Sequence, residues 1–487
     1  MTTPPNLLLF MPDQLRADCV GAFGNDIVQT PNIDSLASRG TVFKEAYSQH
    51  SACTQSRVSM FTGLYPHVTG HRTLNHLLHP HEPNVFRSLK ESGYHVALAG
   101  ARGDMMAPGV TEDSVSRFGF TRPPEPAALA RFGPTVYPPE HRYYNVFYDG
   151  LYSEDLFDFD EATVQTAIDW LTDGLPEPWC LFIALMYPHP PFAVSEPWFS
   201  MHDRSAVPSP TPPRATGEPR YMQAIRDRYE LDRLDESDWR ELIATYYGMI
   251  SRVDDQFGQV ITAVNAAGLN DRTVTFFLTD HGEYLGDFGL IEKWMSGLDD
   301  CLLHNPLIVH DPAARASETS TFVELIDLAP TLLDYAGVDS QHLQFGRSLR
   351  PVVLDPTRDH RDAAFSEGGV NRNEVHLLDS VEGGPYQHKL ALQNEDTTLL
   401  GRAISVRTQD WVYIERLYEP AELYDRHNDP DGTTNVAHVP ENADTCRELK
   451  DRIFAWLLET SDVSSSTVDE RLDPALVASL IENLNNN

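Results

Sequence analysis

Short apolar runs alternate with amphipathic segments along the first 360 residues of the chain. Continuous apolar runs with the length of buried strands occupy residues 6–11, 94–99, 179–187, 273–278 and 306–309, with another extended segment at 41–47. Apolar residues at helical spacing occupy residues 31–39, 83–92, 154–173, 236–268 and 323–335. Strands that alternate with helices predict an α/β fold, with a doubly wound, mainly parallel sheet flanked by helices.

The pattern changes beyond about residue 360. Short strand candidates at 403–406 and 411–414 precede a helical pattern near 444–459. We therefore expect a smaller C-terminal subdomain with an antiparallel sheet and a closing helix. The predicted division is an α/β domain over 1–360, an α+β subdomain over 361–463 and a polar tail over 464–487, which is a candidate oligomer contact. Two segments without a strong period, 103–152 and 193–235, are expected to form loops that shape a pocket wall.

A cysteine stands at the start of a further helical pattern, over residues 53–63. Arg57 follows Cys53 by four residues, which places both side chains on one face of a helix. Open amides at a helix N-terminus and a guanidinium together suit an oxyanion, and they would also lower the pKa of a thiol. The alternative is a small buried residue at a helix start.

Charge and cysteine content narrow the class of protein. The 487 residues include 72 acidic and 37 basic side chains, for a formal net charge of −35. This balance argues against nucleic acid or an anionic membrane as a broad partner, and it suits high salt. No signal-peptide pattern and no apolar run of 18 residues is present, which predicts a cytoplasmic protein without a membrane partner. Five scattered cysteines without CxxC spacing argue against a disulfide framework or a zinc knuckle.

Polar groups follow three of the predicted strands. They are Asp13 with Gln14, His189, and Asp280 with His281. Because the carboxyl ends of parallel strands share one edge of a sheet, these groups can converge on the helix that begins at Cys53. Two carboxylates, an amide oxygen and an imidazole form a candidate site for one divalent cation. Each aspartate taken alone is more often a turn or a helix cap.

With these residues in place, the sequence resembles the sulfatase branch of the alkaline phosphatase superfamily over nearly its whole length. The segments that carry the resemblance are 6–14, 30–37, 53–63, 280–283, 305–309, 326–333, 346–349 and 422–425. In that family the cysteine is oxidised to formylglycine, whose hydrate attacks sulfur or phosphorus. The resemblance implies that Cys53 is the precursor of this nucleophile, and it implies a maturation enzyme and a small anionic ester as partners.

The resemblance also implies roles for individual residues. Asp13, Gln14, Asp280, His281 and the modified residue 53 would hold the cation, with Ca²⁺ favoured and Mn²⁺, Mg²⁺ or Zn²⁺ as alternatives. Arg57 and Lys293 would neutralise the oxygens of the transferred group. His189 would bind an oxygen or protonate the leaving alcohol.

Two departures from the family pattern concern maturation and substrate binding. Gln55 stands where the family usually has proline, two residues after the cysteine that the maturation enzyme recognises. Where the family often has a Gly-Lys-x-His segment, this chain has Arg102 in place of the lysine and lacks the histidine. His71 or His76 could take the place of the missing histidine. Together with Arg102 and Asn75, they are the predicted substrate-binding residues.

The residues and the resemblance together leave three candidate functions. The first is hydrolysis of sulfate monoesters. The second is hydrolysis of phosphonate monoesters or phosphodiesters, because Gln14 together with His281 matches those members of the superfamily equally well, and one enzyme could accept both ester types. The third is a protein with unmodified Cys53 that binds anions or is a weak catalyst.

Overall fold

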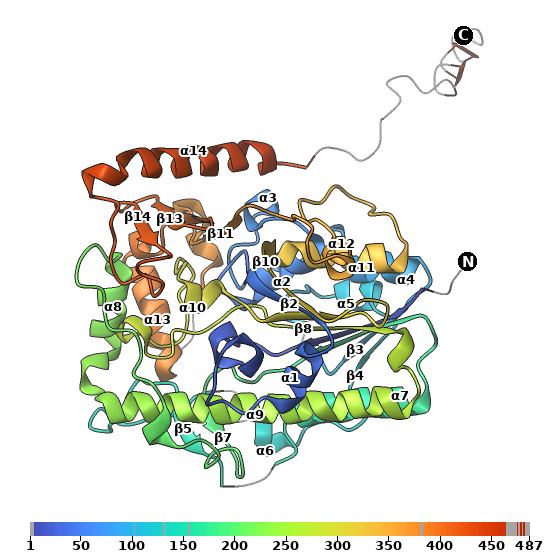
Figure 1. The fold of residues 1–487 in the computed structure, drawn as a ribbon, viewed down its shortest axis with the longest axis horizontal. Helices are drawn as coiled ribbons and strands as arrows, with labels where there is room; N and C mark the ends of the chain where they lie inside the picture. Colours follow the sequence, from blue (N-terminus) through green and yellow to red (C-terminus); the bar gives the residue numbers. More distant parts are fainter. Residues whose placement is uncertain are drawn as a thin grey trace.

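Eight strands form the main sheet, with helices on both faces (Figure 1). The structure, a computed structural model, describes residues 4–101, 103–129, 131, 133–153, 156–379, 383–463, 475, 478–479 and 481–482. The strand order is β10-β2-β9-β8-β1-β6-β3-β4. These strands are β1 (Asn6–Met11), β2 (Thr41–Tyr47), β3 (His95–Ala99), β4 (Arg117–Gly119), β6 (Trp179–Ala184), β8 (Thr273–Leu278), β9 (Leu307–His310) and β10 (Ser317–Glu324).

The centre of the sheet is apolar because it is covered on both sides. β1 lies between β6 and β8 and is parallel to both, with Leu7 opposite Cys180 on one side and Val274 on the other. All residues of these three strands are buried. Continuous apolar strands are expected where helices cover both faces of a parallel sheet. The antiparallel exception is β9, which pairs with β2 and β8.

Two apolar clusters lie on the two faces of the sheet. One contains residues of α1, α7 and α9, including Leu36, Trp170 and Phe257. The other contains residues of α2, α4 and α11, including Phe61 and Phe86. The bounds of these helices are α1 (Pro31–Ala37), α2 (Cys53–Thr62), α4 (Val85–Glu91), α7 (Phe159–Asp173), α9 (Glu236–Ala266) and α11 (Leu328–Ala336). The predicted doubly wound, mainly parallel fold is confirmed.

A separate antiparallel sheet follows in the chain, with the order β11-β12-β13-β14. α14 (Ala443–Thr460) packs on β12 and β13 through Leu449 and Ile453 (Figure 1). The strands are β11 (Ala364–Gly368), β12 (Ala403–Arg407), β13 (Trp411–Arg416) and β14 (Glu422–Asp425). This part of the fold also matches the prediction, whereas the exact division of the chain near residue 360 stays a prediction. Most of the predicted tail, 464–487, lies outside the described residues.

Several predicted elements differ from the structure. Residues 317–324 form β10, so the helix predicted over 323–335 begins only at Leu328, after a 3-10 turn. The sequence pattern does not reveal this edge strand, because its residues before Phe322 are polar. The strand predicted to end at Tyr187 ends at Ala184. Within the described residues the helix predicted from 154 begins at Phe159, where Asp158 caps it.

The two segments predicted as loops contain regular structure. The first contributes α5 (Val110–Ser114), β4, α6 (Pro126–Leu129) and β5 (Tyr148–Leu151), and the second contributes α8 (Arg220–Tyr229) and most of β7 (Phe192–Val194). β5 and β7 pair in parallel. Most of these elements are only three to five residues long and too short for a period, whereas α8 buries Tyr221, Met222, Ile225 and Tyr229 at helical spacing and could have been predicted.

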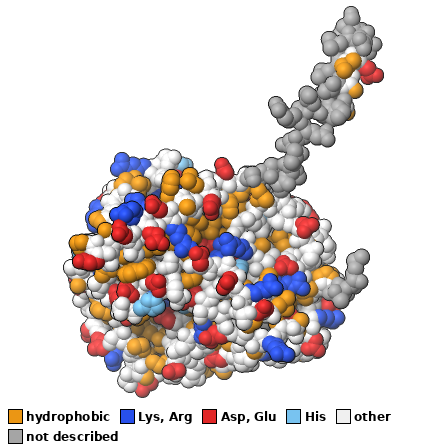
Figure 2. All heavy atoms as spheres, turned by 45° about the horizontal axis from the view of Figure 1, so that its top comes forward, with side chains coloured by type: hydrophobic (Ala, Val, Ile, Leu, Met, Phe, Trp, Pro, Cys, Tyr) orange, Lys and Arg blue, Asp and Glu red, His pale blue; other side chains and the backbone are white. Residues whose placement is uncertain are grey.

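The surface is mixed in charge on the face that Figure 2 shows, where acidic and basic side chains are interspersed with small apolar patches. Among the described residues, no helix is both long and apolar enough to cross a bilayer.

Candidate active site

Four predicted metal ligands come together at the carboxyl ends of the central strands. Asp13 follows β1, Asp280 and His281 follow β8, and Cys53 is the first residue of α2. One ligand atom from each residue lies within 4.8 Å of the others, and all four residues are buried. Residues separated by more than 260 positions therefore meet because their strands are neighbours in the sheet.

Backbone contacts fix the two loops that carry these ligands. The Asp13 amide donates to the Tyr187 carbonyl at 3.1 Å, and the Gln14 amide donates to Asp280 Oδ1 at 3.1 Å. Gln14 has a φ of 66°, a left-handed conformation that turns the chain away from β1. Left-handed backbone at a non-glycine residue costs free energy and is concentrated at functional sites.

Arg57 links the two carboxylates. Its Nη2 lies 2.7 Å from Asp13 Oδ2, and its Nε lies 2.8 Å from Asp280 Oδ2. Nη1 lies 3.3 Å from Asp104 Oδ2. The planar guanidinium makes these contacts from three separate nitrogen atoms, whereas an ammonium would have to make them from one. Arg57 thereby orients both carboxylates toward Cys53.

The donor set fits a divalent cation. Nδ1 of His281 lies 2.9 Å from the Gly282 carbonyl and so carries the proton, which leaves the Nε2 lone pair facing the cluster. Nε2 lies 3.2 Å from Cys53 Sγ and 3.8 and 4.0 Å from the Asp13 and Asp280 Oδ1 atoms. A lone pair that faces two carboxylate oxygens is a repulsive arrangement, which a cation bound between them would relieve. Two carboxylates and an imidazole are suitable ligands for such an ion.

The protonation of the cluster follows from its burial. Burial, together with the charge of Asp13, raises the pKa of the Cys53 thiol, which therefore stays protonated in the absence of a cation. Burial lowers the pKa of His281, so the imidazole is neutral, as a metal ligand must be. An unmodified Cys53 in this setting is a poor nucleophile.

Gln14 and Lys293 extend the site away from the four ligands. Lys293 Nζ donates to Gln14 Oε1 at 2.5 Å and to Glu292 Oε1 at 2.6 Å, and Gln14 Nε2 donates to Glu283. Although burial opposes it, the carboxylate of Glu292 raises the pKa of Lys293, so its ammonium stays charged. The amide oxygen of Gln14 thus faces an ammonium in this structure, and its role as a metal ligand stays a prediction.

The remaining predicted residues lie around this centre. His189 Nδ1 lies 2.7 Å from the Pro190 carbonyl, and the residue lines a hollow of about 40 Å³ together with Tyr152 and Phe159. Burial raises the pKa of Asp160, which also lines this hollow, to about 7.

The predicted substrate-binding residues hold their own loop together. His71 bonds to Glu82 at 2.9 Å, and His76 bonds to the Gly70 carbonyl at 2.9 Å. Asn75 donates to Asp379 at 2.6 Å. The structure does not group these three side chains with Cys53, and Arg102 lies outside the described residues.

Sequence reasoning missed two residues of α13 (Gly384–Glu395), namely Tyr386 and Lys389. Lys389 bonds to Glu292, the carboxylate that also holds Lys293. The scarcity of lysine could have drawn attention to it, because only five occur in the chain and two of them meet here.

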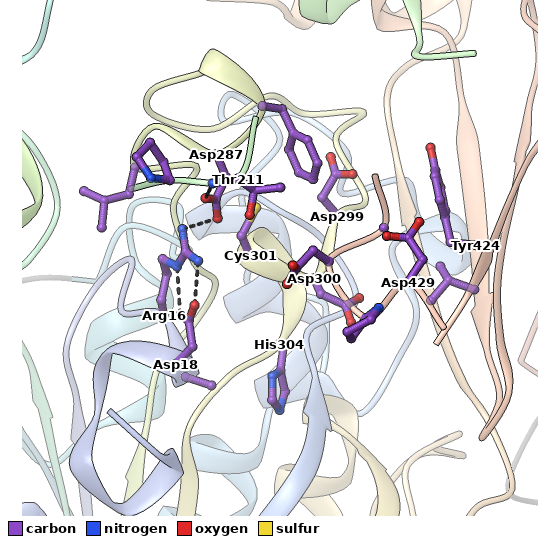
Figure 3. A pocket seen from close by; sticks show the side chains of 18 of the residues that line it. Arg16, Asp18, Thr211, Asp287, Asp299, Asp300, Cys301, His304, Tyr424 and Asp429 are labelled. Carbon is purple, nitrogen blue, oxygen red and sulfur yellow. Dashed lines mark hydrogen bonds and ion pairs between the residues drawn. The ribbon is translucent and has the colours of Figure 1, made fainter. Parts of the chain in front are cut away.

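A second, larger cavity of about 360 Å³ lies elsewhere, between the segments that follow β1 and β8 and the C-terminal sheet (Figure 3). Arg16 and Asp18 line one wall, and Tyr424 and Asp429 line the opposite one. Arg16 lies 2.6 Å from Asp18 and 2.7 Å from Asp287, so its charge is compensated within the wall. No described residue that was predicted for the active site lines this cavity.

Comparison with known proteins places this geometry in a family. The sequence profile described as Sulfatase matches residues 5–338. The chain belongs to the sulfatase family. It is 26% identical to the multifunctional alkaline phosphatase superfamily protein PehA of Trinickia caryophylli, over 94% of this chain and 96% of that protein. It is 24% identical to the choline-sulfatase of Rhizobium meliloti, over 95% and 89% of the two chains.

Solved structures show the same fold. The phosphonate monoester hydrolase of Agrobacterium radiobacter superposes with a TM-score of 0.76 at 24% identity, over 96% of this chain and 98% of that one. A 2-O glycosaminoglycan sulfatase, BT1596, gives a TM-score of 0.71 at 20% identity, over 95% of each chain. Sulfatases and phosphonate monoester hydrolases thus share this architecture.

Proposed function

We propose that this member of the sulfatase family is a metal-dependent hydrolase of sulfate monoesters, with formylglycine derived from Cys53 as its nucleophile. The observation that carries the proposal is the buried cluster of Asp13, Cys53, Asp280 and His281, with Arg57 held across both carboxylates. This cluster places ligands for a cation beside the positive charge of the Arg57 guanidinium, which suits an anionic ester.

Each residue then has a defined task. Asp13, Gln14, Asp280, His281 and residue 53 hold the cation, with Ca²⁺ favoured and Mn²⁺, Mg²⁺ or Zn²⁺ as alternatives. When bound, the cation polarises the ester oxygens, and a formylglycine hydrate would supply the attacking hydroxyl. Arg57 and Lys293 compensate the negative charge of the transferred group, and His189 donates a proton to the leaving alcohol. Arg102, His71, Asn75 and His76 remain predicted substrate contacts.

Hydrolysis of phosphonate monoesters or phosphodiesters is the second candidate. It is supported by Asp13-Gln14 with Asp280-His281, which resembles those members of the superfamily as much as the sulfatases, and by the fold that the chain shares with phosphonate monoester hydrolases. A sulfate monoester and a phosphodiester each carry one negative charge, so one pocket could accept both.

A protein with unmodified Cys53 is the third candidate, and Gln55 is the observation that favours it. Gln55 is buried in the first turn of α2, with its Nε2 3.5 Å from Met295 Sδ. In that case the site binds anions with little turnover. The cytoplasmic location, the maturation enzyme and an oligomer contact through 464–487 stay predictions.

The first experiment is mass spectrometry of the peptide that contains residue 53, combined with an aldehyde-trapping reagent. We expect a loss of about 18 Da, which lies outside the ordinary oxidation ladder of cysteine. Turnover of an aryl sulfate, an aryl phosphonate and a phosphodiester is then measured on the same preparation. Chelation should abolish turnover and readdition of the cation should restore it, with the Cys53→Ala variant as the inactive control.

The outcomes separate the three candidates. A larger kcat/KM for the aryl sulfate supports the first, and a larger kcat/KM for the phosphorus esters supports the second. A preparation that stays wholly cysteine and turns over nothing supports the third. Full turnover with unmodified cysteine would contradict the formylglycine mechanism.

A further inference from the structure

α13 brings two polar side chains of the C-terminal part of the chain to the active site. The carbonyl of Pro385, near the start of this helix, accepts a hydrogen bond from the Tyr229 hydroxyl at 3.0 Å. The ring of Tyr386 packs edge-on against Phe147, with 4.8 Å between the ring centroids. These contacts fix the first turn of α13, and therefore the direction of the side chains that leave it.

Tyr386 presents an unused hydroxyl. Among the described residues, none lies within hydrogen-bond distance of this oxygen, although the atom is buried. Burial raises the pKa of Tyr386, and the nearby acidic groups Glu292, Glu283 and Asp13 raise it further. A buried hydroxyl without a partner costs free energy. The same helix is joined to the active site by Lys389, whose partner Glu292 also binds Lys293, which in turn donates to Gln14.

Lys389 stands one turn further along α13 and has donors to spare. Its ammonium binds Glu292, which also accepts from Lys293. An ammonium has three N–H donors, and the contact with Glu292 uses one of them. Two lysines share a single carboxylate, so this group of three side chains carries one excess positive charge when both lysines are protonated, although burial and the charge of Lys293 lower the pKa of Lys389.

Lys389 is the more exposed of the two lysines that bind Glu292. The Lys389 side chain is 12% exposed, compared with 6% for Lys293 and 0% for Asp13. Although burial alone would raise it, the pKa of Glu292 is lowered by Lys293, Lys389 and His189, so the imidazole lies near this carboxylate. The alcohol part of an ester bound at a buried centre must extend toward solvent, so the more exposed of the two lysines is the one placed to meet it.

On the basis of the proposed function, we propose that Tyr386 and Lys389 form a subsite for an anionic substituent, a carboxylate or a second sulfate, on the alcohol part of the substrate. The Lys389 ammonium and the Tyr386 hydroxyl donate to its oxygens. Arg57 and Lys293 compensate the charge of the transferred group and are not part of this subsite. The subsite selects the alcohol and takes no part in bond cleavage, and it disfavours a cationic alcohol.

The test compares 4-carboxyphenyl sulfate with phenyl sulfate in wild-type and variant enzymes. The change in kcat/KM between enzymes is measured for each ester, so the different leaving groups cancel. We expect Lys389→Met to lower kcat/KM for the carboxylate ester at least tenfold more than for phenyl sulfate, mainly through KM. Tyr386→Phe should give a smaller selective loss, and Lys389→Arg should keep the preference.

Lys450→Met, at an exposed lysine that binds Glu415, is the control. Equal losses for both esters, or no loss, would overturn the subsite.

Binding of inert analogues separates this inference from the proposed function. The sulfonates 4-(sulfomethyl)benzoate and phenylmethanesulfonate resemble the two esters but cannot be hydrolysed at the C–S bond. Calorimetry should show tighter binding of the carboxylate analogue to the wild type and loss of this difference in Lys389→Met. If the chain hydrolyses no ester yet shows this selectivity, the subsite stands and the proposed function fails. If it hydrolyses sulfates without this selectivity, the subsite fails alone.

Discussion

At the scale of single residues, the two contacts of Arg57 with the buried aspartates are specific to a guanidinium. Arg57→Lys keeps the charge but cannot reach Asp13 and Asp280 together, so one buried carboxylate loses its partner. We expect kcat/KM to fall about a hundredfold, the scale of losing one group that stabilises the transition state. Loss of one partner of a buried ion pair should also cost about 3 kcal/mol of stability.

Steady-state kinetics and thermal unfolding measure these two effects. Arg315→Lys, at an exposed arginine, is the matched control and should change neither. Full activity in Arg57→Lys would show that charge alone is needed at this position.

Gln55 permits a direct test of maturation. It is the third residue of α2, where a backbone N–H has no partner within the helix, so proline is tolerated there. Gln55→Pro restores the usual pattern of the family and should raise the fraction of residue 53 converted to the aldehyde. The stability cost should stay below about 1 kcal/mol.

Aldehyde trapping and mass spectrometry quantify that fraction. Gln55→Ala removes the same side chain without adding proline and should leave the fraction unchanged. An equal fraction in all three proteins would mean that residue 55 does not limit conversion.

The placement of site residues shows what a sequence can predict at this scale. Asp13 and Asp280 follow continuous apolar runs, and the ends of neighbouring parallel strands must meet, so their convergence could be predicted. Tyr386 and Lys389 belong to a helix without a clear apolar face, about 100 residues after Glu292. Only the packing of α13 against the site brings them there, and no local pattern encodes that packing.

At the scale of elements, Glu367 of β11 links the C-terminal sheet to a short helix of the preceding part of the chain. His67, in the short helix α3 (Pro66–Thr69), lies 2.7 Å from Glu367 Oε1, and Arg402 lies 2.6 Å from Oε2. Although burial alone would raise it, the hydrogen bond from His67 and the charge of Arg402 lower the pKa of Glu367 to about 2. This carboxylate therefore stabilises the fold above about pH 4.5, and the contribution is lost as pH falls from there toward 2.

Glu367→Gln should remove this contribution. We expect it to lower the free energy of unfolding by about 3 kcal/mol at pH 7. The difference from wild type should shrink between pH 4.5 and 3, because the wild-type carboxylate then loses its advantage. Urea midpoints across this pH range measure the difference. Glu415→Gln, at the partly exposed partner of Lys450, is the control, and a difference that is independent of pH would contradict the assignment.

Helices and strands could be predicted from the sequence where their burial produces a regular pattern of apolar residues. β1, β8 and α9 match the predicted segments closely, because their apolar positions face a core. β10 lies at the edge of the sheet and exposes several polar residues, so its sequence has no continuous apolar run. Its pairing with β2, and not its own composition, makes it a strand.

At the scale of the whole molecule, the net charge of −35 sets the response to salt. Like charges on a compact chain repel each other, and unfolding separates them, so screening should favour the folded state. Surface ion pairs such as Lys450–Glu415 are weakened by salt, but each contributes only about 0–1 kcal/mol. We expect the thermal midpoint to rise between about 0.05 and 0.5 M KCl, as the screening length falls below about 10 Å. Sucrose at matched osmolality controls for solute exclusion from the protein surface. A midpoint that stays constant or falls would mean that the paired charges outweigh the net repulsion.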